Sequence, residues 1–187
     1  MRWLSNWFGG KLSGEKKMAA LTPGAQAPQF ELPAIDGSKF SLQDALARGP
    51  VLAVFFKISC PTCQYAAPFF QRLYSAYGNA KFTVVGISQN DKRDTAAFIQ
   101  KFGITFPVLL DDTNTYPASN AYGLTNVPTS FWIAEDGEIE ITSVGWARRE
   151  FEEMAAKAAV VGEVPPVALF QRSEQIADFR AGCGSKN

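Results

Sequence analysis

The 187-residue chain contains no histidine, and this absence excludes several kinds of active site. Without an imidazole there is no Ser-His-Asp triad, no Cys-His protease dyad and no histidine metal ligand. Cysteine is scarce as well, with Cys60, Cys63 and Cys183. A structural zinc site usually needs four Cys or His ligands, and a disulfide-stapled secreted scaffold would be richer in cysteine. Redox chemistry is therefore the natural use of the close pair, and we expect no metal and no cofactor other than a redox-active disulfide within the chain.

An excess charge and a long apolar run are also missing. Eighteen basic residues balance eighteen acidic ones, which removes the electrostatic attraction that most nucleic-acid-binding proteins use. No apolar run is long enough for a signal peptide or a membrane span, so we expect a cytoplasmic protein. The composition is 47% hydrophobic with 15 Phe, which is enough to build a substantial core. The length suits one domain with extensions.

The first 20 residues are expected to be a flexible N-terminal segment. The stretch of residues 3–8 is rich in tryptophan and apolar side chains and is flanked by cations, a combination that suits weak contact with a membrane surface. A flexible tail explains the same residues more simply. Met18 is an alternative start, because the sequence becomes typical of a folded domain just after it, at Leu21.

Beyond about Ala27, strand and helix patterns alternate, which predicts an α/β layered domain. Val51–Phe56 is a continuous apolar run of strand length, typical of a strand that is covered on both faces. Asp136-Gly137 predicts a hairpin turn between the last two strands. The expected strands cover residues 30–32, 51–56, 82–87, 106–110, 129–133 and 138–142, and the expected helices cover residues 61–77, 91–102 with its capping aspartate, 116–122 and 149–161. Residues 163–187 follow as a C-terminal extension whose glycine-flanked end, residues 181–185, is expected to be mobile.

Cys60 stands between the apolar strand and an amphipathic helix, and Pro61 directly follows it. Proline is favoured at the first helical position, because the amide proton that it lacks would have no partner there. Cys60 is therefore predicted at the N-cap, where free backbone N–H groups and the helix dipole stabilise a thiolate. We expect its pKa to be lowered into the range of about 3.5–7.5 known for such motifs.

Cys63 follows one helical turn later on the same face, so its sulfur can reach that of Cys60. We expect it to be the more buried of the two. Cys60 would then attack a substrate disulfide as a thiolate, and Cys63 would resolve the mixed disulfide. The alternatives are two ordinary buried thiols, or a zinc half-site shared between subunits.

Further segments of the chain resemble one known group of proteins. Gly24–Leu32, Asp36-Gly37 and Ser41-Leu42 resemble its opening hairpin, Phe55-Phe56 with Cys60-Pro61-Thr62-Cys63 its active-site segment, and Pro68 the kink-forming proline of its next helix. This group is the redoxin branch of the thioredoxin superfamily, which includes AhpC/TSA-type peroxiredoxins and TlpA/ResA-like disulfide reductases. The resemblance covers roughly residues 24–161. It implies a thioredoxin-like α/β domain over residues 21–162, with a central mixed β-sheet flanked by helices and an N-terminal β-hairpin.

The segment Val127-Pro128-Thr129 resembles the cis-proline loop of that family. The resemblance implies that this loop lies against the two cysteines and that the Val127 backbone pairs with an extended substrate. Substrate contacts are accordingly expected at Val127, Pro128, Pro61 and Thr62. The implied partners are protein or small-molecule disulfides and dithiols, together with an external electron donor or acceptor.

The chain departs from the family pattern at two positions. Reductases of this group often carry an acid at the place of Val54 or of Ala66, so no proton acceptor for Cys63 is identified. Lys57 is an auxiliary candidate, because its charge could lower the pKa of Cys60. A solvated lysine is the simpler interpretation.

A thiol peroxidase is the main alternative function. Cys60 would then become a sulfenic acid and Cys63 would resolve it. Peroxiredoxins usually place Thr or Ser three residues before the reactive cysteine, where this chain has Lys57, and an activating arginine would have to be Arg148 or Arg149. A redoxin-like binding module without activity is a further alternative, against which the intact cysteine pair counts.

Cys183 is the second auxiliary candidate. It lies between two glycines near the end of the chain. Its thiol could reach another molecule or fold back toward the cysteine pair, and a free surface thiol is the simpler expectation.

Overall fold

The computed structural model describes residues 19–78 and 81–186, so the expectations for the first 18 residues lie outside the described part. The domain opens with an antiparallel hairpin of β1 (Glu31–Pro33) and β2 (Lys39–Ser41). Its turn is held by the Asp36 carboxylate, which accepts hydrogen bonds from the backbone N–H and the hydroxyl of Ser38. Ser41 then caps the short helix α1 (Leu42–Leu46). The expected N-terminal hairpin is confirmed.

A mixed sheet of five strands forms the centre of the domain, in the order β5-β4-β3-β7-β8. The parallel strands are β3 (Val51–Phe56), β4 (Thr83–Ser88) and β5 (Val108–Leu110), and the antiparallel ones are β7 (Thr129–Ile133) and β8 (Ile139–Val144). All six residues of β3 are buried, because the strand is central and both faces of the sheet are covered. The fold predicted from the sequence is confirmed.

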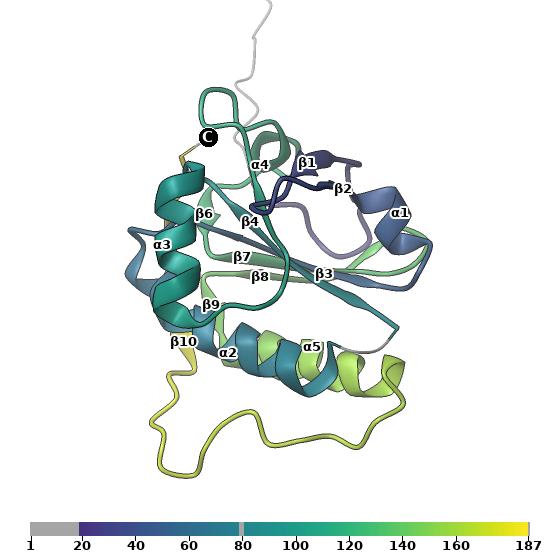
Figure 1. Ribbon diagram of the computed structural model, residues 1–187. Helices are drawn as coiled ribbons and strands as arrows, with labels where there is room; N and C mark the ends of the chain where they lie inside the picture. Colours follow the sequence, from purple (N-terminus) through teal and green to yellow (C-terminus); the bar gives the residue numbers. More distant parts are fainter. Residues whose placement is uncertain (1–18, 79–80, 187) are drawn as a thin grey trace, which may run out of the picture.

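Helices cover both faces of this sheet (Figure 1). α2 (Pro61–Tyr77), α3 (Lys92–Phe102) and α5 (Arg148–Val161) lie on one face, and α1, α4 (Pro117–Ala121) and the hairpin lie on the other. Side chains that alternate along β3 show this division. The Phe55 ring contacts that of Tyr122 beside α4, whereas the Phe56 ring stacks on that of Phe98 in α3.

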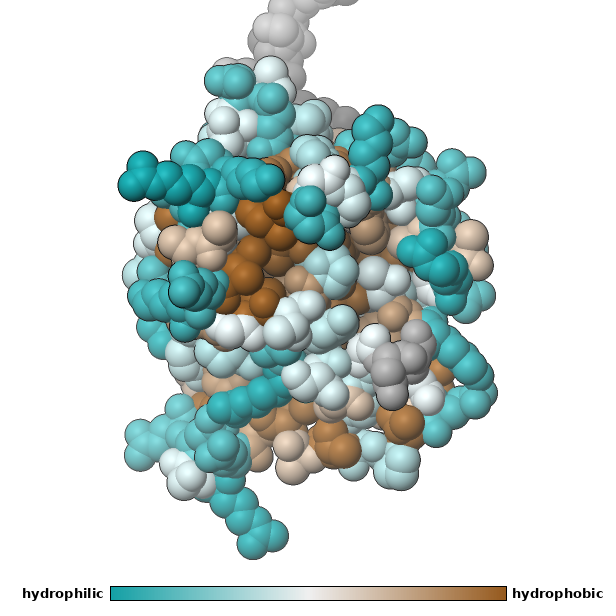
Figure 2. Space-filling model, in the orientation of Figure 1, coloured by the Kyte–Doolittle hydropathy of each residue, from teal (hydrophilic) through white to brown (hydrophobic). Residues whose placement is uncertain are grey.

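The surface is mainly hydrophilic, and Figure 2 shows hydrophobic atoms gathered beside α3 in a region framed by hydrophilic residues. Among the described residues, the large hydrophobic side chains that remain exposed are Val144, Val160, Val167 and Phe179. None of the helices in residues 19–78 and 81–186 has the length and apolarity needed to cross a membrane.

The ends of the long helices follow the local signals in the sequence. Pro61 occupies the first turn of α2 after the N-cap Cys60. Asp91 caps α3 by accepting a hydrogen bond from the Asp94 backbone N–H. Gly103 ends α3 with a φ of 61°, a left-handed conformation that glycine adopts without a steric cost.

The C-terminal extension, whose end was expected to be a mobile tail, folds back onto the domain in this structure. Figure 1 shows the chain leaving α5 and returning through β10 toward its end. β10 (Phe179–Arg180) pairs with β9 (Trp146–Ala147), and β11 (Cys183–Gly184) pairs with β6 (Asn126–Val127). Gly182, one of the glycines that indicated flexibility, also lets the tail backbone approach β6 closely, because a Cβ added there would lie 2.8 Å from the Val127 carbonyl oxygen.

The path to these short strands is fixed by side chains of the domain. The Trp146 indole N–H donates to the Ala177 carbonyl oxygen at 2.8 Å. Arg72 forms two hydrogen bonds with the Glu174 carboxylate, at 2.8 and 2.6 Å. The backbone N–H of Ala177 donates to the Tyr65 hydroxyl at 3.0 Å. These contacts bring residues 179–186 to the end of β3 that is followed by the cysteine pair.

Candidate active site

Cys60 lies at the N-cap of α2, as the sequence predicts. Its backbone is extended, and its Sγ accepts a hydrogen bond from the Cys63 backbone N–H at 3.4 Å. In the thiol form, Sγ donates to the carbonyl oxygen of Val127 at 3.2 Å. The residue has no exposed surface in this arrangement, and Cys63 is 2% exposed. The helix start therefore brings two sulfurs together, and neither lies open to solvent.

Contacts with its neighbours lower the pKa of Cys60 to about 5 from its ordinary value of 9.0. The largest cause is a hydrogen bond with the Cys63 side chain, which stabilises the Cys60 thiolate. Burial acts in the opposite direction, and hydrogen bonds from the side chain and backbone of Cys183 lower the pKa further. Cys60 is therefore the sulfur that is ready to act as an anion at neutral pH.

Cys63 is placed in an apolar surrounding, and burial raises its pKa above the ordinary value. A small cavity of about 20 Å³ beside it is lined by Val54, Ala66, Phe70 and Pro128, among other apolar residues. Burial in such a site disfavours the charged form. The hydrogen bond to the Cys60 thiolate raises the pKa of Cys63 as well. Val54 and Ala66, which stand where related reductases often carry an acid, are part of this apolar surrounding. With its pKa raised, Cys63 is a protonated thiol in the reduced protein.

The loop before β7 meets this pair. The Val127–Pro128 peptide bond is cis, as predicted for this segment. Val127 is fully buried, and its carbonyl oxygen points to Cys60. Thr62, which was predicted to contact substrate, donates its hydroxyl proton to the Ala181 carbonyl oxygen at 2.7 Å. The predicted substrate-binding residues therefore come together around the two cysteines, and the chain's own tail lies against them.

Lys57, one of the two predicted auxiliary residues, contacts the short strand that holds the other, Cys183. The Lys57 ammonium donates to the carbonyl oxygen of Gly184, next to Cys183 in β11. Its charge lowers the pKa of Cys183, where it only partly offsets the raising effects of burial and of the Cys60 sulfur. The pKa of Cys60 is instead set mainly by Cys63, by burial and by Cys183. Lys57 therefore interacts with the backbone of the tail.

Arg148, one of the two arginines considered for a peroxidase mechanism, is engaged in other contacts. Arg148 donates to the Glu152 carboxylate at 2.9 Å and lies over the Phe170 ring, 5.3 Å from its centroid. Asp178 lies 4.0 Å from the same guanidinium. These contacts belong to the surface where α5 meets the C-terminal extension.

The sequence analysis missed two polar residues beside the site. Gln89 is fully buried, and its amide donates to the Ser185 hydroxyl at 2.6 Å and accepts from the Lys186 backbone N–H at 3.1 Å. Asn90 accepts a hydrogen bond from the backbone N–H of Ile58 at 3.1 Å. The sequence could have indicated them, because Gln89 and Asn90 follow the end of the buried strand β4. β4 is parallel to β3, so its end lies beside the end of β3 that is followed by Cys60.

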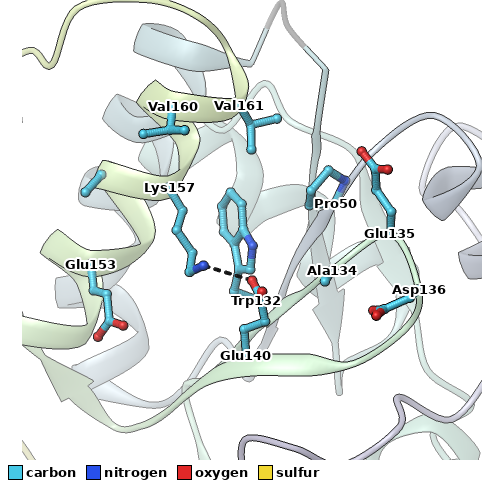
Figure 3. A pocket seen from close by; sticks show the side chains of 11 residues that line it. Pro50, Trp132, Ala134, Glu135, Asp136, Glu140, Glu153, Lys157, Val160 and Val161 are labelled. Atoms are coloured by element: carbon cyan, nitrogen blue, oxygen red, sulfur yellow. Dashed lines mark hydrogen bonds and ion pairs between the residues drawn. The ribbon is translucent and has the colours of Figure 1, made fainter.

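A broad hollow on the described surface lies away from the cysteines. It has a volume of about 720 Å³ and is lined by Trp132, Pro50 and side chains of α5. Figure 3 shows the Lys157–Glu140 ion pair, at 2.9 Å, across the Trp132 ring. Pro50 precedes β3, whereas Cys60 follows its far end, and six strand residues span about 20 Å. This hollow therefore plays no part in the chemistry of the cysteine pair.

Comparison with known proteins identifies the family. The family model described as AhpC/TSA family matches residues 23–142. The chain belongs to the AhpC/TSA family. The thiol-disulfide oxidoreductase ResA of Geobacillus thermodenitrificans is 28% identical over 132 residues, which cover 70% of this chain and 74% of ResA. A candidate peroxiredoxin of Mycobacterium tuberculosis is 33% identical over 135 residues, covering 67% of this chain and 86% of the relative.

A solved structure shares the fold. The thioredoxin domain of a thiol-disulfide oxidoreductase from Bacteroides vulgatus matches with a TM-score of 0.66 at 20% identity, over 74% of this chain and 98% of that domain. The fold of this AhpC/TSA member is thus thioredoxin-like. Its relatives are thiol-disulfide oxidoreductases and candidate peroxiredoxins, so the protein is an oxidoreductase.

Proposed function

We propose that this protein is a thiol-disulfide oxidoreductase in which Cys60 is the nucleophile and Cys63 the resolving cysteine. The observation that carries this proposal is the position of the Cys60 sulfur at the start of α2, where it accepts a hydrogen bond from Cys63 and has a pKa lowered to about 5. A thiolate is the reactive form in disulfide exchange. At neutral pH Cys60 is in that form, whereas Cys63 keeps its proton.

The reaction begins when the Cys60 thiolate attacks a substrate disulfide. A bond forms between Cys60 and one substrate sulfur, and the other substrate sulfur leaves as a thiolate. Cys60 then carries no negative charge, so Cys63 loses its hydrogen-bond acceptor, and its proton can pass to the leaving thiolate. Cys63 next attacks the Cys60 sulfur and releases the second substrate thiol. The products are a reduced substrate and a Cys60–Cys63 disulfide, which an external dithiol reduces to restore the enzyme.

The backbone at Val127 supports a role for extended substrates. β6 ends at the cis-proline, and its Val127 carbonyl oxygen lies 3.2 Å from the Cys60 sulfur. A strand paired with β6 would bring its own residue opposite Val127 next to that sulfur. The proposed substrates are therefore disulfides in extended peptide segments, or small disulfides that fit the same position.

Disulfide exchange fits the surroundings of Cys60 better than peroxide reduction does. The position three residues before Cys60 holds Lys57, whose ammonium is bound to Gly184. Arg148 is engaged by Glu152. Peroxide reduction remains the alternative function because one relative is a candidate peroxiredoxin.

Insulin reduction in the presence of dithiothreitol tests the proposal. The wild-type protein should accelerate it, and Cys60→Ser should abolish the acceleration. A Cys63→Ser/Cys183→Ser double variant, which has no other thiol, should still attack insulin through Cys60 and be retained as a mixed disulfide, visible on non-reducing gels when dithiothreitol is left out. Rapid consumption of hydrogen peroxide by the reduced protein, lost in Cys60→Ser and accompanied by no insulin reduction, would favour the peroxidase instead.

A further inference from the structure

The C-terminal tail lies in the position proposed above for a substrate strand. β11 pairs antiparallel with β6, and Cys183 is directly opposite Val127. The carbonyl oxygen of Val127 lies 3.2 Å from the Cys60 sulfur, so this register places Cys183 beside the nucleophile. A cysteine of the same chain is thus presented to the nucleophile from an extended, backbone-paired segment.

Contacts on both sides of Cys183 fix the tail in this register. Thr62 donates to the Ala181 carbonyl oxygen, and Lys57 donates to that of Gly184. Beyond the strand, the backbone N–H of Ser185 donates to the Thr125 carbonyl oxygen at 3.0 Å. The buried amide of Gln89 also binds this end of the tail, as described above. Side chains around the cysteine pair therefore bind the tail backbone, which is how an extended peptide is recognised independently of most of its side chains.

The docked tail also explains why the nucleophile is covered. Cys60 has no exposed surface, whereas Cys183 is partly exposed. A substrate disulfide can reach Cys60 only after β11 leaves β6. The tail and an external substrate thus compete for the same strand position.

We propose that residues 179–186 are a built-in substrate of the active site and that Cys183 is a third redox cysteine, which exchanges disulfides with Cys60. This inference rests on the proposed function of Cys60. In the oxidised chain the Cys183 thiolate attacks the Cys60 sulfur. The Cys60–Cys63 bond breaks as the Cys60–Cys183 bond forms, and Cys63 leaves with the proton that Cys183 gave up. Cys183 enters the disulfide and Cys63 becomes the free thiol. The number of disulfide bonds is unchanged, so the step needs no external oxidant or reductant.

The tail also indicates which peptides fit the site. Gly182 precedes the reacting cysteine, and a Cβ at this position would lie 2.8 Å from the Val127 carbonyl oxygen and 3.2 Å from the Asn126 Cβ. At Gly184, on the other side of Cys183, an added Cβ would meet nothing within 4 Å. The site therefore accepts an extended peptide with glycine directly before the cysteine and tolerates a side chain directly after it.

The two glycines supply a matched pair of variants for the test. The parent is reduced Cys63→Ser, which retains Cys60 and Cys183, and the oxidant is oxidised glutathione. Cys60 attacks the glutathione disulfide and releases one glutathione. Cys183 then attacks the Cys60 sulfur and releases the second, so that two protein thiols are oxidised as one glutathione disulfide is reduced. Intact mass and peptide mapping follow the Cys60–glutathione adduct and the Cys60–Cys183 disulfide with time.

The expected result is a transient adduct that gives way to the Cys60–Cys183 disulfide. Adding Gly182→Ala should make the adduct at least about fivefold longer-lived, because the added methyl group overlaps backbone that the docked tail must approach. Adding Gly184→Ala should leave the adduct lifetime as in the parent. An adduct that persists equally in all three proteins would overturn the role of Cys183 but leave Cys60 as the nucleophile. If Cys60 formed no adduct in any of them, the proposed function itself would fail.

Discussion

The lowered pKa of Cys60 predicts how the stability of the reduced protein depends on pH. A group whose pKa is lower in the folded state stabilises the fold where it is ionised, and this contribution is lost as pH falls through the folded value. For a thiol that titrates at about 5 when folded and at 9.0 when unfolded, the contribution at pH 7 is roughly 2.7 kcal/mol. It shrinks to about 0.4 kcal/mol at pH 5. The free energy of unfolding should thus rise by about 2 kcal/mol from pH 5 to pH 7 through Cys60 alone.

The other two cysteines do not obscure this effect. The pKa values of Cys63 and Cys183 are raised above 9.0, so both thiols stay protonated in the folded and the unfolded state throughout this pH range. The assay is urea denaturation of the reduced protein at several pH values, compared with reduced Cys60→Ser. The oxidised wild-type protein is the matched control, because a Cys60–Cys63 disulfide has no thiol at residue 60 to titrate. The free energy of unfolding of the reduced wild-type protein should rise from pH 5 to pH 7 by about 2 kcal/mol more than that of Cys60→Ser. The oxidised wild-type protein should show no such additional rise. A difference that stays flat between pH 5 and pH 7 in the reduced state would refute the reasoning.

Two further predictions concern the elements that carry the site. Asp91→Ala removes the side-chain cap of α3 and should lower the free energy of unfolding by about 1 kcal/mol in urea denaturation. Asp91→Asn is the conservative control, because it retains a capping oxygen. Equal losses of stability in both variants would contradict the cap. Leu73→Ala removes most of a fully buried side chain of α2 and should lower the free energy of unfolding by about 2–5 kcal/mol in the same assay. Leu73→Met, which keeps the volume, should lower it by less than about 1.5 kcal/mol. A loss below about 1 kcal/mol for Leu73→Ala would show that this face of α2 is not packed as described.

The parts of the fold with strong local signals could be predicted from the sequence. Val51–Phe56 and Pro61–Tyr77 were expected with the bounds that the structure shows, because a wholly apolar run and a proline after the capping cysteine are unambiguous. The helix between Asp91 and Gly103 was also predicted from its cap and its terminal glycine. The α/β class followed from the order of these elements, and the thioredoxin-like architecture was implied by the resemblance to the redoxins.

The docking of the tail could not be predicted in the same way. Its contacts join residues far apart in the chain, such as Trp146 with Ala177 and Cys183 with Val127, and no local pattern encodes such pairs. The glycines on either side of Cys183 pointed toward disorder, yet Gly182 is what lets the tail approach β6. The role of Lys57 was obscured for the same reason, since its partner Gly184 belongs to the tail.

The most direct test of the account is a pH titration of the Cys60 thiolate in the reduced protein. Thiolate absorbance at 240 nm, checked by the pH dependence of alkylation at Cys60, should show a midpoint near 5 in the wild-type protein. The midpoint should move toward 9.0 in Cys63→Ala, because the hydrogen bond from Cys63 is the largest cause that lowers the pKa. A wild-type midpoint of 8 or above would contradict the claim that the start of α2 holds Cys60 as an anion ready for disulfide exchange.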